Sequence, residues 1–351
     1  YRIWRLHSRR SGQNRVLMVT PDAIGTHRLR CSDLGERCRV RNAVVCREAW
    51  SALLSRPIRE LRAPMSSAVG YGVYGSASVL ATEQYESSPL IIDPYAIRLL
   101  PPALHLKALA TRRAPVRRAM IAATEKKICG GWAGVLCRKR YIDEQLIEAL
   151  ADGLDAVIIL GGVVDTRLYR IPQLTGVPVW EVDLPANSIR KQQVAARRFG
   201  YIPRHATYVA ADLATENMTK CLSDSGFDLD MRAFVIWEAV SMYLTEATVR
   251  RTLRHMLALA PGSRLAFTFL RKAFVDGFAM YGARAGYDEF VTQQQLWHFG
   301  LHPEQVAELL AEYDWDLLLH VGAAEYLQRY LRPAHRDLPV SEIERAVIAQ
   351  R

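Results

Sequence analysis

The sequence lacks several features that would assign its function at once. It contains no apolar run near the ~18 uninterrupted residues that a membrane span requires, so no membrane span is expected. No Cys-x-x-Cys pair occurs, and His298 and His302 are not followed by the Glu of a zinc-protease motif, so no metal site is expected. Six cysteines without a recognisable secretory segment favour reduced thiols and a cytoplasmic location.

Acidic residues are scarce in the N-terminal part of the chain. Residues 1–64 contain 14 Arg, no Lys and five acids, a balance of +9, which leaves +1 of the total of +10 for the other 287 residues. The arginines are scattered, and no binding motif accompanies them, so nucleic-acid binding is not expected. We expect residues 1–64 to be a basic extension, disordered or mis-assigned, and a folded domain to occupy residues 65–351.

The stretch that organises the rest of the chain begins at Asp155. The segment Asp155–Leu160 is apolar after its first residue and rich in β-branched side chains, as in a strand buried on both faces of a parallel sheet. Gly161 and Gly162 allow a tight turn at its end. A second apolar run, Val177–Val182, leads to Asp183, an acid suited to the two hydroxyls of a ribose. This pattern predicts half of a nucleotide-binding α/β unit.

The third glycine of the dinucleotide fingerprint G-x-G-x-x-G is missing, because the sequence here is G-G-V-V-D. Asp165 would also repel a pyrophosphate at this position. An acid there suits a cofactor with cationic groups and no phosphate, such as S-adenosyl-L-methionine. The spacing alone leaves open an ordinary turn between strand and helix, and an NAD(P)-dependent oxidoreductase is disfavoured by the missing glycine.

Further strands and helices alternate along the chain after this unit. We expect strands at residues 207–210, 233–237, 265–269 and 314–321, and helices at residues 138–150, 185–201 and 246–259. This alternation predicts an α/β fold with a doubly wound, mostly parallel sheet. Acids follow successive strands, and ligands bind at that edge of such sheets, so we expect a site formed by Asp165, Asp183, Asp212 and Glu238.

Two regions depart from this alternation. Residues 65–154 have a mostly helical pattern broken by prolines, and residues 271–306 are rich in Phe, Tyr and Gly. We therefore expect a helical cap at residues 65–150 and a core at residues 151–351 that carries an insertion at residues 271–306.

Several motifs, in order along the chain, resemble those of one known family. They are P-L-I-I-D-P-Y-A (89–96), R-K-R-Y-I-D (138–143), I-L-G-G-V-V-D-T-R-L-Y-R-I (159–171), W-E-V-D-L-P (180–185), A-A-D-L (210–213), W-E-A-V-S-M-Y-L-T (237–245) and S-E-I-E-R-A-V (341–347). From Met65 onward the chain resembles the leucine carboxyl methyltransferase family, in particular its actinobacterial branch of S-adenosyl-L-methionine-dependent methyltransferases. The resemblance implies a Rossmann-like fold and S-adenosyl-L-methionine as the cofactor.

The resemblance also implies roles for residues that would hold the methionine part of the cofactor. Arg138 would bind the methionine carboxylate with its planar guanidinium. Gly161 would allow the backbone to approach the methionine moiety closely. Glu238 would lie near the sulfonium or the amino group.

The nucleoside part of the cofactor has its own implied contacts. Asp183 would accept hydrogen bonds from the ribose hydroxyls, and Glu181 is the alternative if Asp183 does not. Asp212 would accept from the adenine amino group, with the backbone of Leu213 beside it.

The resemblance leaves the acceptor open. Methyl transfer to an oxygen, of a carboxylate or a hydroxyl, is the expected reaction, and the acceptor could be a small molecule, a lipid acid or a peptide end. A carboxylate is already ionised at neutral pH, so no catalytic base is assigned. Val163 departs from the family, which has glycine there, and a degenerate binding protein without turnover is therefore an alternative.

Overall fold

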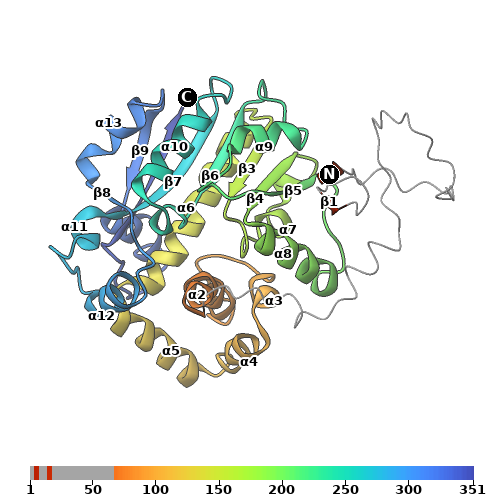
Figure 1. Cartoon of the computed structure of the whole chain (residues 1–351). Coiled ribbons are helices and arrows are strands. Elements are labelled where there is room, and N and C mark those ends of the chain that lie inside the picture. Colours follow the sequence, from red (N-terminus) through yellow and green to blue (C-terminus); the bar gives the residue numbers. More distant parts are fainter. Residues whose placement is uncertain (1–3, 8–13, 18–66) are drawn as a thin grey trace, which may run out of the picture.

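The computed structural model describes residues 4–7, 14–17 and 67–351. In the N-terminal part, β1 (Trp4–His7) and β2 (Asn14–Leu17) pair as a two-stranded antiparallel sheet (Figure 1). The rest of the predicted basic extension lies outside the described residues, so the division at residue 64 stays a prediction.

An eight-stranded sheet forms the centre of the described molecule. Its strand order is β5-β4-β3-β6-β7-β10-β9, and β8 pairs with β7 beside this path. Neighbouring strands from β5 to β7 are parallel, whereas β10 is antiparallel to both β7 and β9. This arrangement confirms the predicted Rossmann-like, mostly parallel sheet. The strands are β3 (Ala156–Leu160), β4 (Val179–Asp183), β5 (Ala206–Ala210), β6 (Ala233–Trp237), β7 (Arg264–Arg271), β8 (Gly300–Leu301), β9 (Asp316–Val321) and β10 (Glu344–Gln350).

The sheet separates two hydrophobic cores. Every residue of β3, β4 and β6 is buried, because helices cover both faces of these strands. Along β3, Val157 and Ile159 belong to one core, and Ile158 and Leu160 belong to the other. This alternation follows from the twofold periodicity of a strand, and it explains why the sequence reads as a continuous apolar run.

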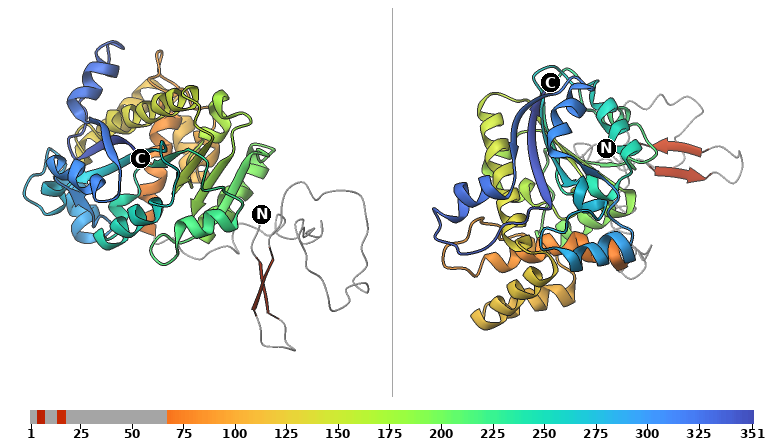
Figure 2. Two further views of the ribbon diagram at one scale, coloured as in Figure 1. Left: turned by 90° about the horizontal axis from the view of Figure 1, so that it is seen from above. Right: turned by 90° about the vertical axis from the view of Figure 1, so that its left-hand side faces the viewer.

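Helices form the two outer layers (Figure 2). Buried residues of α2, α3, α4, α6, α8 and α14 join the first core, whereas those of α9, α10 and α13 join the second. The α-helices are α2 (Ser67–Glu83), α3 (Ala96–Leu99), α4 (Pro102–Ala110), α5 (Ala114–Lys127), α6 (Gly131–Ala151), α7 (Arg167–Arg170), α8 (Pro185–Arg198), α9 (Met218–Asp224), α10 (Glu246–Met256), α11 (Lys272–Val275), α12 (Arg284–Tyr287), α13 (Val306–Ala311) and α14 (Ala323–Tyr326). Within the described part of the chain, none of these is both long and apolar enough to cross a bilayer.

Helix α6 begins seven residues earlier than predicted. The sequence pattern placed Arg138 at the N-terminal end of this helix, which is wrong, because α6 starts at Gly131 and Arg138 lies about two turns inside it. Gly130 has φ of +73°, and a Cβ atom there would lie 2.2 Å from the backbone nitrogen of Ser341. The glycines allow this close approach, and they also hide the start of the helix from an apolar-periodicity analysis.

The topology reverses between β3 and β6. From β3 the chain proceeds through β4 to β5 at one edge, and it then returns to place β6 and β7 on the other side of β3. Ligands of doubly wound sheets bind at such a switch point, outside the carboxyl ends of the strands. Because β10 is antiparallel, its first residue, Glu344, pairs with Leu270 near the end of β7 and lies at this same edge.

Candidate functional site

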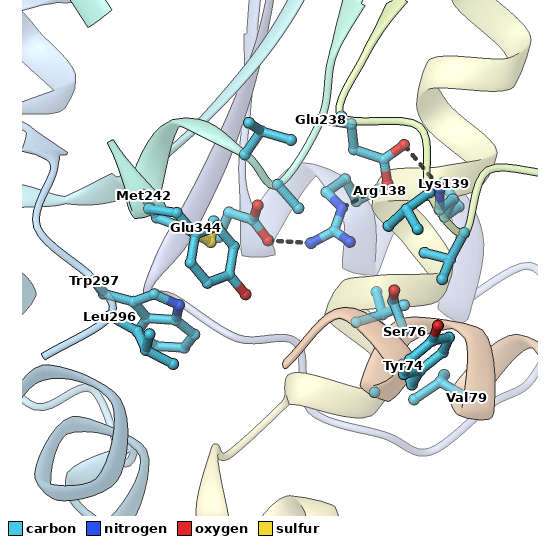
Figure 3. A pocket seen from close by; sticks show the side chains of 18 of the residues that line it. Tyr74, Ser76, Val79, Arg138, Lys139, Glu238, Met242, Leu296, Trp297 and Glu344 are labelled. Atoms are coloured by element: carbon cyan, nitrogen blue, oxygen red, sulfur yellow. Dashed lines mark hydrogen bonds and ion pairs between the residues drawn. The ribbon is translucent and has the colours of Figure 1, made fainter. Parts of the chain in front are cut away.

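A cavity of about 780 Å³ lies at the carboxyl edge of the sheet. Its walls come from the ends of β3, β4, β5 and β6, from α2, α4, α5 and α6, from residues 290–298, and from the start of β10. Its volume falls in the range of sites for cofactors and small molecules. In Figure 3, Arg138, Glu238 and Glu344 form a polar group in the wall, and Met242, Leu296 and Trp297 lie to one side of it.

The turn after β3 depends on two glycines for different reasons. Gly161 has φ of +74°, and a Cβ atom there would lie 2.4 Å from a methyl group of Val240. A Cβ atom at Gly162 would lie 2.5 Å from the carboxyl carbon of Glu181. Val163 is not among the described residues with positive φ, and its buried side chain lines the cavity. The backbone of the turn therefore accepts valine without strain, and the predicted departure from the family would affect only the cavity wall.

Asp183, the last residue of β4, is buried in the cavity wall. Its Oδ1 atom accepts hydrogen bonds from the Leu184 N–H at 2.7 Å and from Asn187 Nδ2 at 2.8 Å. Its Oδ2 atom has no partner among the described residues. Burial raises the pKa of Asp183, and the Asn187 and Leu184 donors offset part of that rise. An unsatisfied carboxylate oxygen here suits a hydroxyl donor, but the ribose role stays a prediction.

Glu181, the alternative ribose ligand, lies beneath the turn and is not part of the cavity lining. Its carboxylate forms a buried ion pair with Lys191, which also donates to the Gly162 carbonyl at 2.5 Å. Burial raises the pKa of Glu181 to about 8, although Lys191 opposes the rise. Glu181 thus supports the turn from below, and Asp183 is the acid that faces the cavity.

Arg138 joins two carboxylates in the wall of the cavity. Its Nε atom donates to Glu238 at 2.9 Å, and its Nη1 atom donates to Glu344. Lys139 Nζ lies 3.1 Å from the other oxygen of Glu238 (Figure 3). Arg138 and Glu238 were predicted at this site, but Glu344 was not. Glu344 belongs to the motif at residues 341–347, but it stands at the start of its strand, whereas the predicted acids follow theirs.

We expected Asp165 to offer a free negative charge to a cofactor, but in the structure its charge is paired. Its carboxylate is buried and paired with Arg167, and Lys139 lies 3.6 Å away. Burial alone would raise the pKa of Asp165, but Arg167 and Lys139 hold it well below its ordinary value. Asp165 lines the cavity, yet its charge is compensated within the protein.

Arg167 connects this group to a larger buried charge network. Its guanidinium is fully buried, and it donates to Asp143 at 2.6 Å and to Glu238 at 2.8 Å. Burial alone would raise the pKa of Glu238, but Lys139, Arg167 and Arg138 lower it below its ordinary value. The network has four cations and five carboxylates, a net charge of −1: Arg138, Lys139, Arg167, Arg170, Asp93, Asp143, Asp165, Glu238 and Glu344.

Asp212 and Leu213 follow β5 and line the other end of the cavity. The Asp212 carboxylate accepts from the Ala214 N–H at 2.8 Å, and this contact fixes its orientation. The predicted residues Arg138, Gly161, Asp183, Asp212, Leu213 and Glu238 thus all line one cavity. Their individual roles toward a cofactor stay predictions.

The half of the cavity beyond β6 is largely apolar. Phe290 and Trp297 stack with ring centroids 4.5 Å apart, and both belong to a small core formed around residues 271–306. From the helical layer, Lys127 of α5 lies over the Phe290 ring and also lines the cavity. Tyr74 and Val79 of α2 line the cavity on the other side of the polar group (Figure 3). The predicted insertion and helical cap thus supply much of this wall, whereas the strand ends supply the polar half.

Comparisons with known proteins agree with this geometry. Residues 74–257 match the model of the family described as leucine carboxyl methyltransferase. A protein of Mycolicibacterium smegmatis, whose name marks it as an inferred S-adenosyl-L-methionine-dependent methyltransferase, is 33% identical over 205 residues, which is 58% of this chain and 67% of that protein. A protein of Mycolicibacterium paratuberculosis with the same description is 27% identical over 306 residues, covering 82% of this chain and 94% of that protein.

Other matches are shorter or more distant. A Mycobacterium avium protein of the same description is 28% identical over 199 residues, and the match spans 60% of that protein's length and 56% of this chain. A solved structure from Thermobifida fusca, described as that of an inferred methyltransferase, superposes with a TM-score of 0.47 at 18% identity, covering 67% of this chain and 88% of that one.

Proposed function

The chain belongs to the leucine carboxyl methyltransferase family, a family of S-adenosyl-L-methionine-dependent enzymes, and on this premise we propose that it methylates an oxygen atom of an apolar acceptor. The observation that carries the proposal is the division of the cavity. Carboxylates at the ends of four adjacent strands line one half, and aromatic and aliphatic side chains line the other. The first half suits the cofactor and the second suits the acceptor.

The charges around the cavity suit a cofactor with a net positive charge. S-adenosyl-L-methionine supplies an electrophilic methyl group on a sulfonium, and its amino acid part adds one ammonium and one carboxylate, a net charge of +1. The buried network beside the cavity has a net charge of −1. We assign the methionine carboxylate to Arg138, whose Nη2 atom has no partner among the described residues.

The order of the strands supports a proposed position for each part of the ligands. Asp212 after β5 would bind the adenine and Asp183 at the end of β4 the ribose, so the methionine part lies across β3 and β6. The acceptor then lies on the far side of β6, against Trp297 and Glu344. Positioning donor and acceptor in line and excluding water are the main contributions expected of the protein.

Glu344 distinguishes two classes of acceptor. A carboxylate acceptor is already ionised and needs no base, and it would be repelled by Glu344. A hydroxyl acceptor must lose a proton, and Glu344 has an oxygen, Oε1, without a partner among the described residues. We therefore favour a hydroxyl acceptor whose proton is taken by Glu344.

Calorimetric titration tests the cofactor assignment. The full chain should bind S-adenosyl-L-methionine and S-adenosylhomocysteine, and it should not bind NADH. Binding of NADH alone would refute the proposal. Methyl transfer is then tested with a cofactor labelled in its methyl group and a panel of apolar alcohols, phenols and acids, in which label should enter the hydroxyl compounds.

A second candidate function is cofactor binding without turnover, and Val163 is the observation that favours it. Its side chain lines the cavity at a position where the family has glycine. This candidate predicts that both cofactor forms bind and that no compound of the panel is labelled.

A further inference from the structure

The pair of helices α4 and α5 carries an unusual share of the charge of this molecule. Residues 102–127 contain seven cations and one acid, a balance of +6. Residues 65–351 as a whole balance at +1, so the remainder of that region is acidic, at −5. The net charge of residues 65–351 is therefore close to zero because a strongly basic helix pair balances an acidic remainder.

The one acid of this segment faces inward. Glu125 accepts hydrogen bonds from the backbone N–H groups of Gly130 at 2.6 Å and Trp132 at 3.2 Å, at the start of α6. Two of the cations are also paired, since Arg117 bonds Glu86 and Lys127 bonds Glu289. The outer surface of the helix pair is thus left without negative charge.

Four of the cations are exposed and have no partner among the described residues. They are Lys107, Arg113, Arg118 and Lys126. Apolar side chains lie between them on the same surface. Leu106 is 67% exposed and Val116 is 38% exposed, and the exposed alanines of α5 add further apolar area. Cations interleaved with exposed apolar groups are typical of helices that lie on a membrane surface.

The cavity reaches this surface. Lys107 of α4 and Ala123 of α5 are exposed and also line the cavity, next to the half-buried Leu104 and Met120. The two helices lie at the outer side of the helical layer, away from the sheet (Figures 1 and 2). The cavity therefore communicates with the basic surface.

We propose that α4 and α5 dock on an anionic lipid surface and that the acceptor enters the cavity from it. The acceptor part of this inference rests on the proposed function, but the docking does not. Charge complementarity selects the anionic surface, and the exposed apolar residues favour a bilayer over a soluble polyanion, which offers them no apolar environment.

The test measures co-sedimentation of the full chain with phosphatidylcholine vesicles, with and without phosphatidylglycerol. The parent should bind only the anionic vesicles, and salt should weaken binding. The double variant Arg118→Glu/Lys126→Glu should bind at least about thirtyfold more weakly, because each cation near an anionic surface contributes about a factor of five and the new glutamates are repelled by it. Neither residue lines the cavity, so cofactor affinity should be unchanged.

The matched control is Arg204→Glu/Arg254→Glu, which makes the same change of charge at exposed cations. Arg204 precedes β5 and Arg254 lies near the end of α10, so both lie toward the opposite edge of the sheet. Vesicle binding by the control should stay within threefold of the parent. Equal losses in both variants, unchanged binding by the α5 variant, or no vesicle binding by the parent would each overturn the proposal. Retention on heparin that only the α5 variant weakens, without vesicle binding, would assign the surface to a soluble polyanion instead.

Discussion

At the scale of single residues, some carboxylates in the cavity wall are fully paired, whereas others have an oxygen atom without a hydrogen-bond partner. The carboxylates of Asp165 and Glu238 are held by buried cations, and such pairs are difficult to disrupt without large cost. Asp183 and Glu344 each retain one oxygen without a partner among the described residues. A buried oxygen without a donor is costly, and a ligand that supplies the donor recovers that cost.

The first prediction concerns Asp183. Asp183→Ala should weaken binding of S-adenosyl-L-methionine by ~1–3 kcal/mol, since a charge-assisted hydrogen bond is lost. Thermal stability without ligand should change little, because the lost Asn187 and Leu184 contacts are offset by removal of a buried charge. Calorimetry on both proteins decides the question. Asp224→Ala, which removes an exposed acid paired with Lys220, is the control. Unchanged affinity in Asp183→Ala would exclude the ribose role.

Val163→Gly should tighten cofactor binding, because two methyl groups would leave the cavity wall. The added freedom of glycine in the unfolded chain opposes folding by ~0.5–1 kcal/mol, so the melting temperature should fall slightly. Val164→Gly is the matched control, since Val164 also lines the cavity but packs against the first core. If the two variants bind alike, or if Val163→Gly binds more weakly, the valine is only part of the packing.

Glu344→Gln should reduce turnover of a hydroxyl acceptor by about 10²–10⁴, the usual contribution of a positioned base. Turnover of a carboxylate acceptor should not fall. Initial rates with one acceptor of each class give the comparison. Glu342→Gln, which alters an exposed neighbour paired with Arg271, should leave both rates unchanged. Equal losses with both acceptors would mean that Glu344 acts only by positioning Arg138.

At the scale of elements, the unit formed by β4, α8 and the turn after β3 contains a buried titratable pair. Glu181 belongs to β4 and Lys191 to α8, and both support Gly162 from below. The raised pKa of Glu181, about 8, means that the folded protein binds this proton more tightly than the unfolded chain does. The corresponding stability is present below the ordinary pKa of a glutamic acid and is lost as the pH rises toward 8.

The pH dependence of unfolding should therefore change in Glu181→Gln. Between pH 5 and 8 the parent should lose stability relative to this variant, by about 1.4 kcal/mol for each unit of pKa shift. Thermal melts at several pH values measure the difference. Glu308→Gln, at an exposed position on α13, should follow the parent at every pH. Parallel curves for parent and Glu181→Gln would contradict the raised pKa.

The central strands β6 and β7 could be predicted from the sequence because they are buried on both faces. The apolar runs at residues 233–237 and 265–269 match β6 and the centre of β7. The acids that follow parallel strands could be predicted in the same way, and these acids line one cavity. Glu344 could not be predicted, because no local sequence pattern indicates that β10 inserts antiparallel between β7 and β9. The ion pair between Asp165 and Arg167 could not be predicted either. An acid at the end of a strand has the same sequence pattern whether its charge is free or paired with a cation.

At the scale of the whole molecule, described residues between α2 and β10 form the eight-stranded sheet and the two hydrophobic cores on its faces. Among the described residues, those that line the cavity run from Tyr74 to Arg345. We therefore predict that removal of residues 1–64 leaves the fold and the cofactor affinity intact. Circular dichroism, thermal melts and calorimetry on the truncated protein measure both. Insolubility of the truncated protein, or loss of cofactor binding, would show that the segment contributes to the domain.

The position of β10 has a consequence for the synthesis of this protein. β7 leaves the ribosome before residues 272–343, and β9 is made before β10, its only neighbour in the described sheet. Until β10 emerges, the open edge of β7 can pair with another nascent chain, and Arg138 lacks one of its two carboxylates. β10 thus joins β9 to the rest of the described sheet and completes the polar wall of the cavity in a single step.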